Sequence, residues 1–162
     1  MDAIIVFCAK YLIIFVGLLL IWLWFKAPVK IKKKIALQVV IAGIIGIVLI
    51  KIAGKLYYHP RPFVDGHVKP LFPHSNDNGF PSDHTALAMT LTAVIYYYDK
   101  QIAFIAFVLT LATGIARVLA NVHSPVDILG GLLIGAASGW AGWWIAQRLW
   151  AIYKKDKAAK KL

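Results

Sequence analysis

The sequence predicts an all-α membrane protein, a polytopic helix bundle that crosses the bilayer about five times. The hydrophobic fraction is 60%, well above the roughly 45–50% of soluble proteins. Several apolar runs reach the roughly 20 residues that a helix needs to cross a bilayer. A chain of 162 residues has the length of one domain, which we expect to cover 1–162.

Five apolar segments are the expected spans. They cover 3–25, 35–54, 84–98, 102–121 and 125–150. The first lacks the basic start and the small-residue cleavage site of a signal peptide, so we expect it to be retained. The third is the shortest and is just long enough if it begins near Ser82. We expect the core bundle over 35–150, an additional helix in 1–25 and a basic tail in 151–162.

The placement of lysines predicts the orientation. Much of the net charge of +11 comes from lysines in 26–34 and 154–161, with Lys100 after the third span. By the positive-inside rule these segments face the cytoplasm, so the N-terminus and the loop 55–83 face outward (N-out, C-in). Lysines beside apolar runs are typical of segments that meet lipid headgroups. We therefore expect membrane lipids and no nucleic acid as partners.

Composition limits the available chemistry. Cys8 is the only cysteine, which excludes an intrachain disulfide and a cysteine-based metal site. There is no glutamate, and the seven acidic residues are all aspartates. In the expected topology all five histidines fall at or near the outer face, as do Arg61 and Arg117. The histidines are His59, His67, His74, His84 and His123.

The last span carries two packing patterns. Its tryptophans fit an interfacial aromatic belt, and its glycines form a small-residue stripe that lets another helix approach closely. The tryptophans are Trp140, Trp143, Trp144 and Trp150. The glycines are Gly130, Gly131, Gly135 and Gly139.

The segment 117–127 places three polar residues at fixed spacings in an apolar region. Pro125 opens the last span, so Asp127 falls in its first turn and can turn back to the ring of His123. An aspartate on one imidazole nitrogen leaves the other nitrogen free as a nucleophile. Arg117 presents a fork of donors that suits phosphate oxygens. The alternative is a polar cluster that only closes a helix hairpin.

Two upstream motifs have similar character. Ser82 is expected to cap the third span, with Asp83 in its first turn and His84 beside an anion site at the helix N-terminus. The alternative there is a capped helix with an interfacial histidine. Lys55 and Arg61 form either a phosphate clamp or a pair of lipid-headgroup anchors.

The loop 55–83 joins these motifs. It is too long for a passive connector, and such loops are usually functional. We interpret its other histidines, His59, His67 and His74, as interfacial residues. The sequence leaves Asp65, Asp77 and Asn78 either to shape the loop or to bind a cation.

The order of the three motifs resembles the type 2 phosphatidic acid phosphatase superfamily of membrane lipid phosphatases. The segment from Asn78 to Thr85 (NGFPSDHT) is similar to the bacterial undecaprenyl pyrophosphate phosphatases of the bacitracin-resistance type. The chain differs from the family in having one residue fewer between Lys55 and Arg61, Ala116 in place of a serine, and one span fewer than is common.

This resemblance implies a site. His123 attacks the terminal phosphorus and forms a phosphohistidine, Asp127 orients His123, and His84 protonates the leaving oxygen and then activates water. The residues expected to hold the phosphates are Lys55, Arg61, Ser82, Asp83 and Arg117. For Asp83 we expect either a pair with Lys55 or Arg61, or contact with the second phosphate through a bound cation. The chemistry requires no metal and no cofactor.

The resemblance also implies a substrate and a place. We expect a single membrane phosphatase domain in a bacterial cell membrane, with its active site facing the periplasm or the cell exterior. It would hydrolyse a polyprenyl pyrophosphate to the monophosphate and so recycle the lipid carrier of cell-wall synthesis. One alternative is dephosphorylation of phosphatidic acid or phosphatidylglycerol phosphate at the same site. An alternative of another class is a lipid-binding membrane protein without catalysis.

Overall fold

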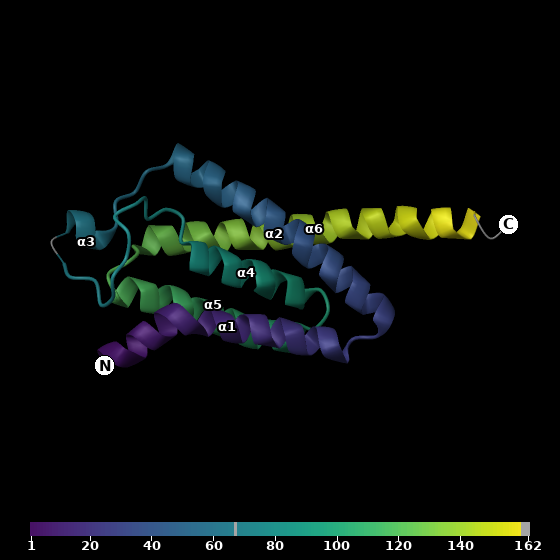
Figure 1. Cartoon of the computed structure of the whole chain (residues 1–162), viewed down its shortest axis with the longest axis horizontal. Helices are drawn as coiled ribbons and strands as arrows, with labels where there is room; N and C mark the ends of the chain where they lie inside the picture. The colour runs from purple at the N-terminus through teal and green to yellow at the C-terminus, as the bar shows by residue number, and fades with distance from the viewer. Residues whose placement is uncertain (67, 160–162) are drawn as a thin grey trace.

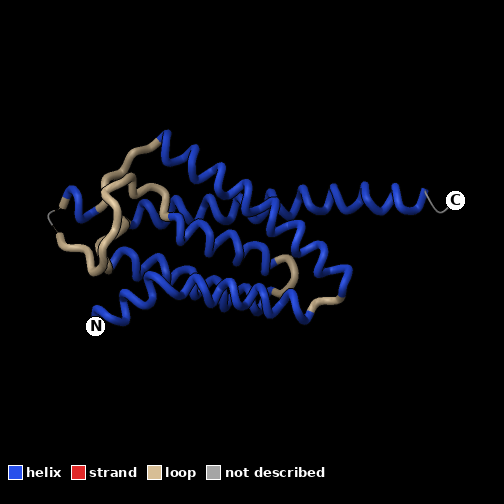
Figure 2. Tube along the Cα trace, in the orientation of Figure 1, coloured by secondary structure: helices blue, strands red, loops and turns tan. Residues whose placement is uncertain are grey.

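The computed structural model describes residues 1–66 and 68–159, and in these ranges it is helical, with loops and no strand (Figures 1 and 2). His67, expected to be interfacial, lies outside the described residues. The helices are α1 (Asp2–Lys26), α2 (Val29–Leu56), α3 (Pro62–Asp65), α4 (Asp83–Tyr96), α5 (Lys100–Leu119) and α6 (Pro125–Ala159). The all-α bundle is therefore confirmed.

Four helices, α1, α2, α5 and α6, are long and apolar enough to cross a membrane. The chain is a multi-pass membrane protein. The third expected span, 84–98, corresponds to α4, which has 14 residues and a length of about 21 Å at 1.5 Å per residue. It is shorter than the roughly 30 Å hydrocarbon core, but it packs against α1, α2, α5 and α6. A short helix is tolerated here because protein, rather than lipid, surrounds it.

The helix ends differ from the expected ones near the basic segments. The loop expected at 26–34 shrinks to Ala27 and Pro28, and the lysines that follow lie on the first turns of α2. At the other end, α6 continues past Trp150 to Ala159. Both extensions are rich in lysine, a good helix former whose ammonium group can reach water beyond an apolar helix.

Different loops and termini lie at the two ends of the bundle. The N-terminus, α3 and the long loop lie at one end, while the α1–α2 connection, the α4–α5 turn and the C-terminus lie at the other (Figure 1). Figure 2 shows the long loop in tan at the first end. The basic segments therefore share one end, as the expected topology requires, and the loop with its motifs occupies the opposite end.

The glycine stripe of α6 packs against α4, as the sequence predicts. A Cβ atom at Gly135 would lie 2.5 Å from the carbonyl oxygen of Ala86 and 2.6 Å from the Cβ of Met89. A Cβ at Gly131 would lie 2.8 Å from the carbonyl oxygen of Ser82. The stripe thus brings the first turn of α6 close to the first turn of α4, where two of the motifs lie.

We expect Gly135→Ala to destabilise the bundle because the added methyl group meets backbone atoms of α4, which cannot turn aside. Overpacking of this kind costs about 1–3 kcal/mol. The matched control is Gly17→Ala in α1, where a Cβ meets nothing within 4 Å. Thermal unfolding in detergent micelles would show a lower midpoint for Gly135→Ala only. Equal midpoints for both variants would contradict the close helix contact.

Candidate functional site

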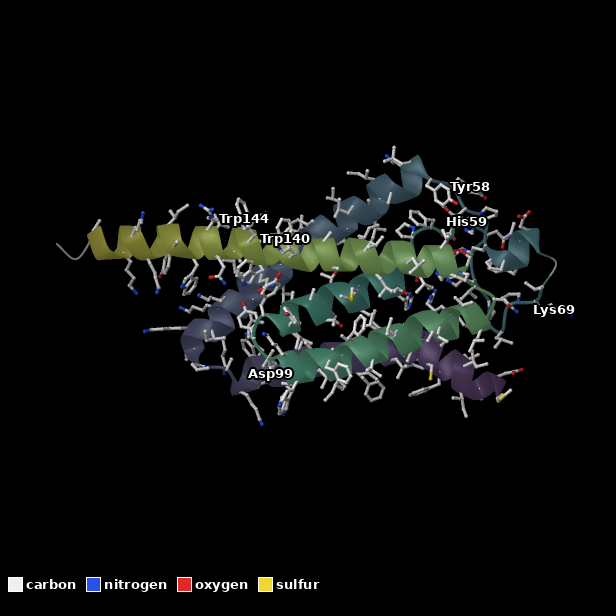
Figure 3. The ribbon with its side chains drawn as sticks, turned by 180° about the vertical axis from the view of Figure 1, so that it is seen from behind. Tyr58, His59, Lys69, Asp99, Trp140 and Trp144 are labelled. Carbon is white, nitrogen blue, oxygen red and sulfur yellow. The ribbon has the colours of Figure 1, made fainter. Side chains whose placement is uncertain are left out.

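The polar residues of the three motifs meet at the loop end of the bundle. Arg117 lies in the last turn of α5, His123 lies in the turn before α6, and Asp127 lies in the first turn of α6. In Figure 3, Tyr58, His59 and Lys69 lie at this end, and Asp99 and Trp144 lie toward the opposite end. The site is therefore built where one helix ends, another begins and the long loop covers both.

The turn between α5 and α6 brings His123 back over α5. Asn121 has a φ of 58°, a left-handed conformation that asparagine tolerates better than most residues. The backbone N–H groups of Val122 and His123 donate to the carbonyl oxygen of Arg117 at 3.2 and 3.3 Å. The side chain of Asn121 donates to the carbonyl oxygen of Lys69 at 3.1 Å. This turn holds His123 close to Arg117.

Asp127 is fully buried and faces His123. Its Oδ2 lies 3.4 Å from Nδ1 of His123 and accepts the backbone N–H of Ser124 at 2.7 Å. The predicted pairing of these two side chains is present. Because the carboxylate can only accept, Nδ1 of His123 is the nitrogen that carries the proton.

The other nitrogen of His123 faces two arginines. Nε2 lies 3.2 Å from Nη1 of Arg61 and 3.2 Å from Nη2 of Arg117. A guanidinium only donates, so Nε2 accepts and keeps its lone pair. Burial lowers the pKa of His123, and the two arginines lower it further, against the hydrogen bond to Asp127, which raises it. The ring is therefore neutral at neutral pH, as a nucleophile must be.

Arg117 is 2% exposed and is held from three directions. It donates to the carbonyl oxygen of Ala9 in α1 at 3.1 Å, to Nε2 of His74 at 3.1 Å and to Nε2 of His123. Its Nε is the one buried side-chain nitrogen or oxygen without a partner in the described part of the chain. The guanidinium thus has a donor left for a substrate oxygen.

Arg61 is also buried and is fixed by the loop. It forms an ion pair with Asp77 at 2.9 Å and donates to the carbonyl oxygens of Val122 at 2.8 Å and Asn78 at 3.3 Å. Partial burial raises the pKa of the Asp77 carboxyl, but hydrogen bonds from Ser75 and Arg61 outweigh it, so the net pKa is lowered. Asp77 therefore stays ionised and anchors Arg61 beside His123.

The second motif lies against the third. Ser82 is buried at the N-cap position of α4, but its side chain makes no capping bond and instead accepts from Oγ1 of Thr85 at 3.1 Å. Its backbone N–H donates to the carbonyl oxygen of Asp127 at 3.0 Å. His84 is half-buried and close enough to interact electrostatically with Arg117 and His123. Ser82 therefore holds the expected N-cap position, but its side-chain hydrogen bond is with Thr85 rather than with the backbone of α4.

Two expected phosphate-site residues lie apart from this cluster. Asp83 is exposed and forms no ion pair in residues 1–66 and 68–159, because Arg61 pairs with Asp77 instead. Lys55 is exposed in the last turn of α2. One turn earlier, Lys51 lines a groove of about 390 Å³ between α2 and α4 together with Asp83 and Leu87. The lysine on the Asp83 side of α2 is therefore Lys51.

Two histidines that the sequence did not predict as site residues contact the site, and Asn78, whose role the sequence left open, supports the loop beside it. His74 and His59 contact Arg117 and Asp127, respectively. Asn78 donates to the carbonyl oxygens of Gly54 and Tyr57 and accepts from the backbone of His59. An irregular loop has no periodicity that would show such contacts. The only signal was their position: His59 lies between Lys55 and Arg61 of the first motif, and His74 and Asn78 lie between the first and the second motif.

His74 lies beside Arg117 and His123 as a neutral ring. Its pKa is lowered, first by burial and then by the charges of Arg61 and Arg117. Its ring lies edge-on to that of His123, with centroids 6.0 Å apart. Nε2 of the neutral ring accepts a hydrogen bond from Arg117, so the ring proton is on Nδ1.

Known proteins are similar to this chain in sequence. The family profile described as the PAP2 superfamily matches residues 34–151. Undecaprenyl-diphosphatase BcrC of Bacillus subtilis (strain 168) is 34% identical over 139 residues, which cover 86% of this chain and 72% of that protein. Bacitracin transport permease protein BcrC of Bacillus licheniformis is 32% identical over 155 residues, which cover 95% of this chain and 76% of that protein.

A solved structure shares the fold. The crystal structure of Aquifex aeolicus LpxE matches with a TM-score of 0.71 and 29% sequence identity, over 87% of this chain and 84% of that chain. The residues matched by the family profile contain all three motifs, from Lys55 to Asp127. The order of the motifs, the helical bundle and these matches lead to one conclusion: the chain belongs to the PAP2 superfamily.

Proposed function

We propose that this protein is a membrane lipid phosphatase that hydrolyses undecaprenyl pyrophosphate to the monophosphate and phosphate through a phosphohistidine. The observation that carries the proposal is the state of His123. Its Nε2 lone pair lies between Arg61 and Arg117, and its Nδ1 proton faces Asp127. A nucleophile next to two phosphate-binding cations is what phosphoryl transfer needs.

In the first step, Nε2 of His123 attacks the terminal phosphorus. The bond from that phosphorus to the bridging oxygen breaks. His84, which begins the cycle as the imidazolium, donates its proton to the departing lipid monophosphate and becomes neutral. The N–H groups of Arg61 and Arg117 that point at Nε2 move to the equatorial oxygens and stabilise their developing charge. Asp127 stabilises the positive charge that forms on the imidazole.

In the second step, His84 takes a proton from water. The hydroxide oxygen of that water attacks the phosphorus. The N–P bond breaks, and the electron pair of this bond returns to Nε2 of His123. Phosphate leaves, and both histidines are again in their starting states. The two half-reactions use the same groups in reverse roles.

The substrate and the location follow from the relatives and the charge distribution. The Bacillus subtilis relative, which is 34% identical over most of this chain, is an undecaprenyl-diphosphatase by name. The apolar groove between α2 and α4 lies beside Asp83 and suits an isoprenoid chain that stays in the bilayer. The Bacillus relatives favour a bacterial cell membrane. The lysines at the opposite end favour an orientation with the site facing the periplasm or the exterior.

A direct assay tests this function. Purified protein in detergent with a chelator is given undecaprenyl pyrophosphate or phosphatidic acid, and released phosphate is measured. We expect the pyrophosphate to be hydrolysed faster. Faster release from phosphatidic acid would favour the alternative phosphatase. No release from either lipid or from phosphatidylglycerol phosphate would favour the lipid-binding protein.

We expect kcat/KM for the pyrophosphate to fall with acid only below about pH 6.5, the ordinary pKa of histidine. Burial lowers the pKa of His123, so the neutral nucleophile persists to lower pH and is lost as pH falls through the lowered pKa. The pH–rate profile checks this after correction for the ionisation of the substrate, titrated separately by ³¹P NMR. An enzyme-derived acid midpoint above pH 6.5 would contradict a buried neutral His123.

We expect Lys51→Ala to reduce kcat/KM more than Lys55→Ala, because Lys51 lines the groove with Asp83 and Lys55 does not. Loss of one charge–phosphate contact costs about 10-fold or more, since charged hydrogen bonds contribute roughly 1.5–3 kcal/mol. The two variants remove the same side chain one helical turn apart and control for each other. A larger loss for Lys55→Ala would restore Lys55 as the phosphate-binding lysine.

A further inference from the structure

We propose that His59 is a positioning residue of this site, one that holds an oxygen of Asp127 so that the other oxygen faces His123. The proposal deepens the proposed function and rests on it. His59 lies between Lys55 and Arg61 but is not one of the residues that define the three motifs, and the sequence alone gives it no role in the chemistry. The structure places its ring against the carboxylate that orients the nucleophile.

The contacts of Asp127 divide between its two oxygens. Oδ1 lies 3.0 Å from Nδ1 of His59, whereas Oδ2 faces Nδ1 of His123 at 3.4 Å and the backbone of Ser124 at 2.7 Å. Because Asp127 is fully buried, no other donor compensates for a lost one at low cost. The shorter of the two imidazole contacts is the one to His59.

His59 is itself held rigidly. Its backbone N–H donates to Oδ1 of Asn78 at 2.9 Å, and its carbonyl oxygen accepts from the backbone of Gly79 at 2.9 Å. Its ring stacks on that of Tyr57, with centroids 5.8 Å apart and planes 16° apart. The side chain of His59 is 29% exposed, so these contacts, rather than burial in the core, hold the ring in place. A partner fixed in this way can fix the carboxylate in turn.

The loss of His59 changes the charge that His123 experiences. The groups that face His123 directly are Arg61, His74, Arg117 and Asp127. His84 and Asp83 on α4 lie further out, within electrostatic range of Arg117. Among the described residues, the ring of His59 contacts Asp127 and not His123, so its effect passes through Asp127. Without the hydrogen bond at Oδ1, the carboxylate is less stabilised and interacts more strongly with the imidazolium form of His123.

The test compares His59→Phe, which keeps a flat ring without a donor, with His59→Asn, which keeps an N–H donor. We expect His59→Phe to lower kcat/KM by roughly 10- to 100-fold, as for partners that orient metal-bound histidines. We also expect the acid limb of its pH profile to move to higher pH. His59→Asn is expected to recover most of the activity and the original limb. Tyr58→Phe, at the exposed neighbouring residue, is the control and is expected to behave as wild type.

Two results would overturn the proposal. One is a His59→Phe variant with wild-type kcat/KM and an unmoved acid limb. The other is a uniform loss with an unmoved limb, which is what a purely structural role produces. NMR titration of ¹⁵N-labelled histidines supplies a readout without substrate: we expect His59→Phe to move the titration of His123 to higher pH. Failure of the lipid assay in wild type alone would therefore count against the proposed function, not against this role.

Discussion

Replacing His123 with alanine is expected to abolish phosphate release from undecaprenyl pyrophosphate. The variant removes the nucleophilic Nε2 and leaves Arg61 and Arg117 without their shared acceptor. Loss of the nucleophile in a covalent mechanism costs on the order of 10⁴-fold or more in kcat. The measurement is phosphate release under single-turnover and steady-state conditions.

Two controls separate loss of chemistry from loss of folding in this variant. Gel filtration and thermal unfolding in detergent show whether His123→Ala keeps the wild-type bundle. A substrate labelled with ³²P at the terminal phosphate is expected to label the wild-type protein transiently and His123→Ala not at all. Retention of a tenth of the wild-type rate, or labelling of the alanine variant, would exclude His123 as the nucleophile.

Replacing Arg117 with lysine is expected to lower kcat/KM by roughly 10²- to 10³-fold, the usual cost of removing one donor that stabilises a developing oxyanion. Lysine keeps the charge but has no planar fork, so it cannot serve Ala9, His74 and His123 together as Arg117 does. Because the position is buried, a variant that keeps the positive charge also keeps the desolvation cost of this side chain close to that of the wild type.

The matched control for this variant is Arg148→Lys. Arg148 lies over the ring of Trp144 at 4.9 Å, in the half of α6 away from the site, and its replacement is expected to leave kcat/KM unchanged. Inorganic phosphate as a competitive inhibitor gives a second readout, and Arg117→Lys is expected to raise its inhibition constant. Equal activity of Arg117→Lys and wild type would show that Arg117 acts by charge alone.

Long, strongly apolar segments were predictable from the sequence because crossing a bilayer requires continuous hydrophobicity and internally satisfied backbone hydrogen bonds. The cores of α1, α2, α5 and α6 follow directly. The boundaries were less predictable where lysine-rich ends continue the helices, as in α2 and α6. The short α4 depends on the neighbours that enclose it, which no local pattern describes.

Some contacts of the candidate site could also be predicted from the sequence, and others could not. The pairing of His123 with Asp127 was predictable because the contact is local. His123 lies in the turn before α6, and Asp127 lies four residues later in the first turn of that helix. The approach of Arg61 to His123 spans 62 residues, and the motif order supported it only through the resemblance to a family. The contact of Arg61 with Asp77, which leaves Asp83 without an ion pair in the described ranges, could not be derived from spacing.

A helical membrane protein with three polar motifs could be predicted from the sequence alone, because hydrophobic length, lysine placement and local spacing are properties of short segments. Which side chains surround those motifs depends on the tertiary structure. His59, His74 and Lys51 come to their places through the path of an irregular loop and the rotation of α2 against α4. Such contacts depend on the three-dimensional packing of distant segments, and that packing leaves no periodic signal in the chain.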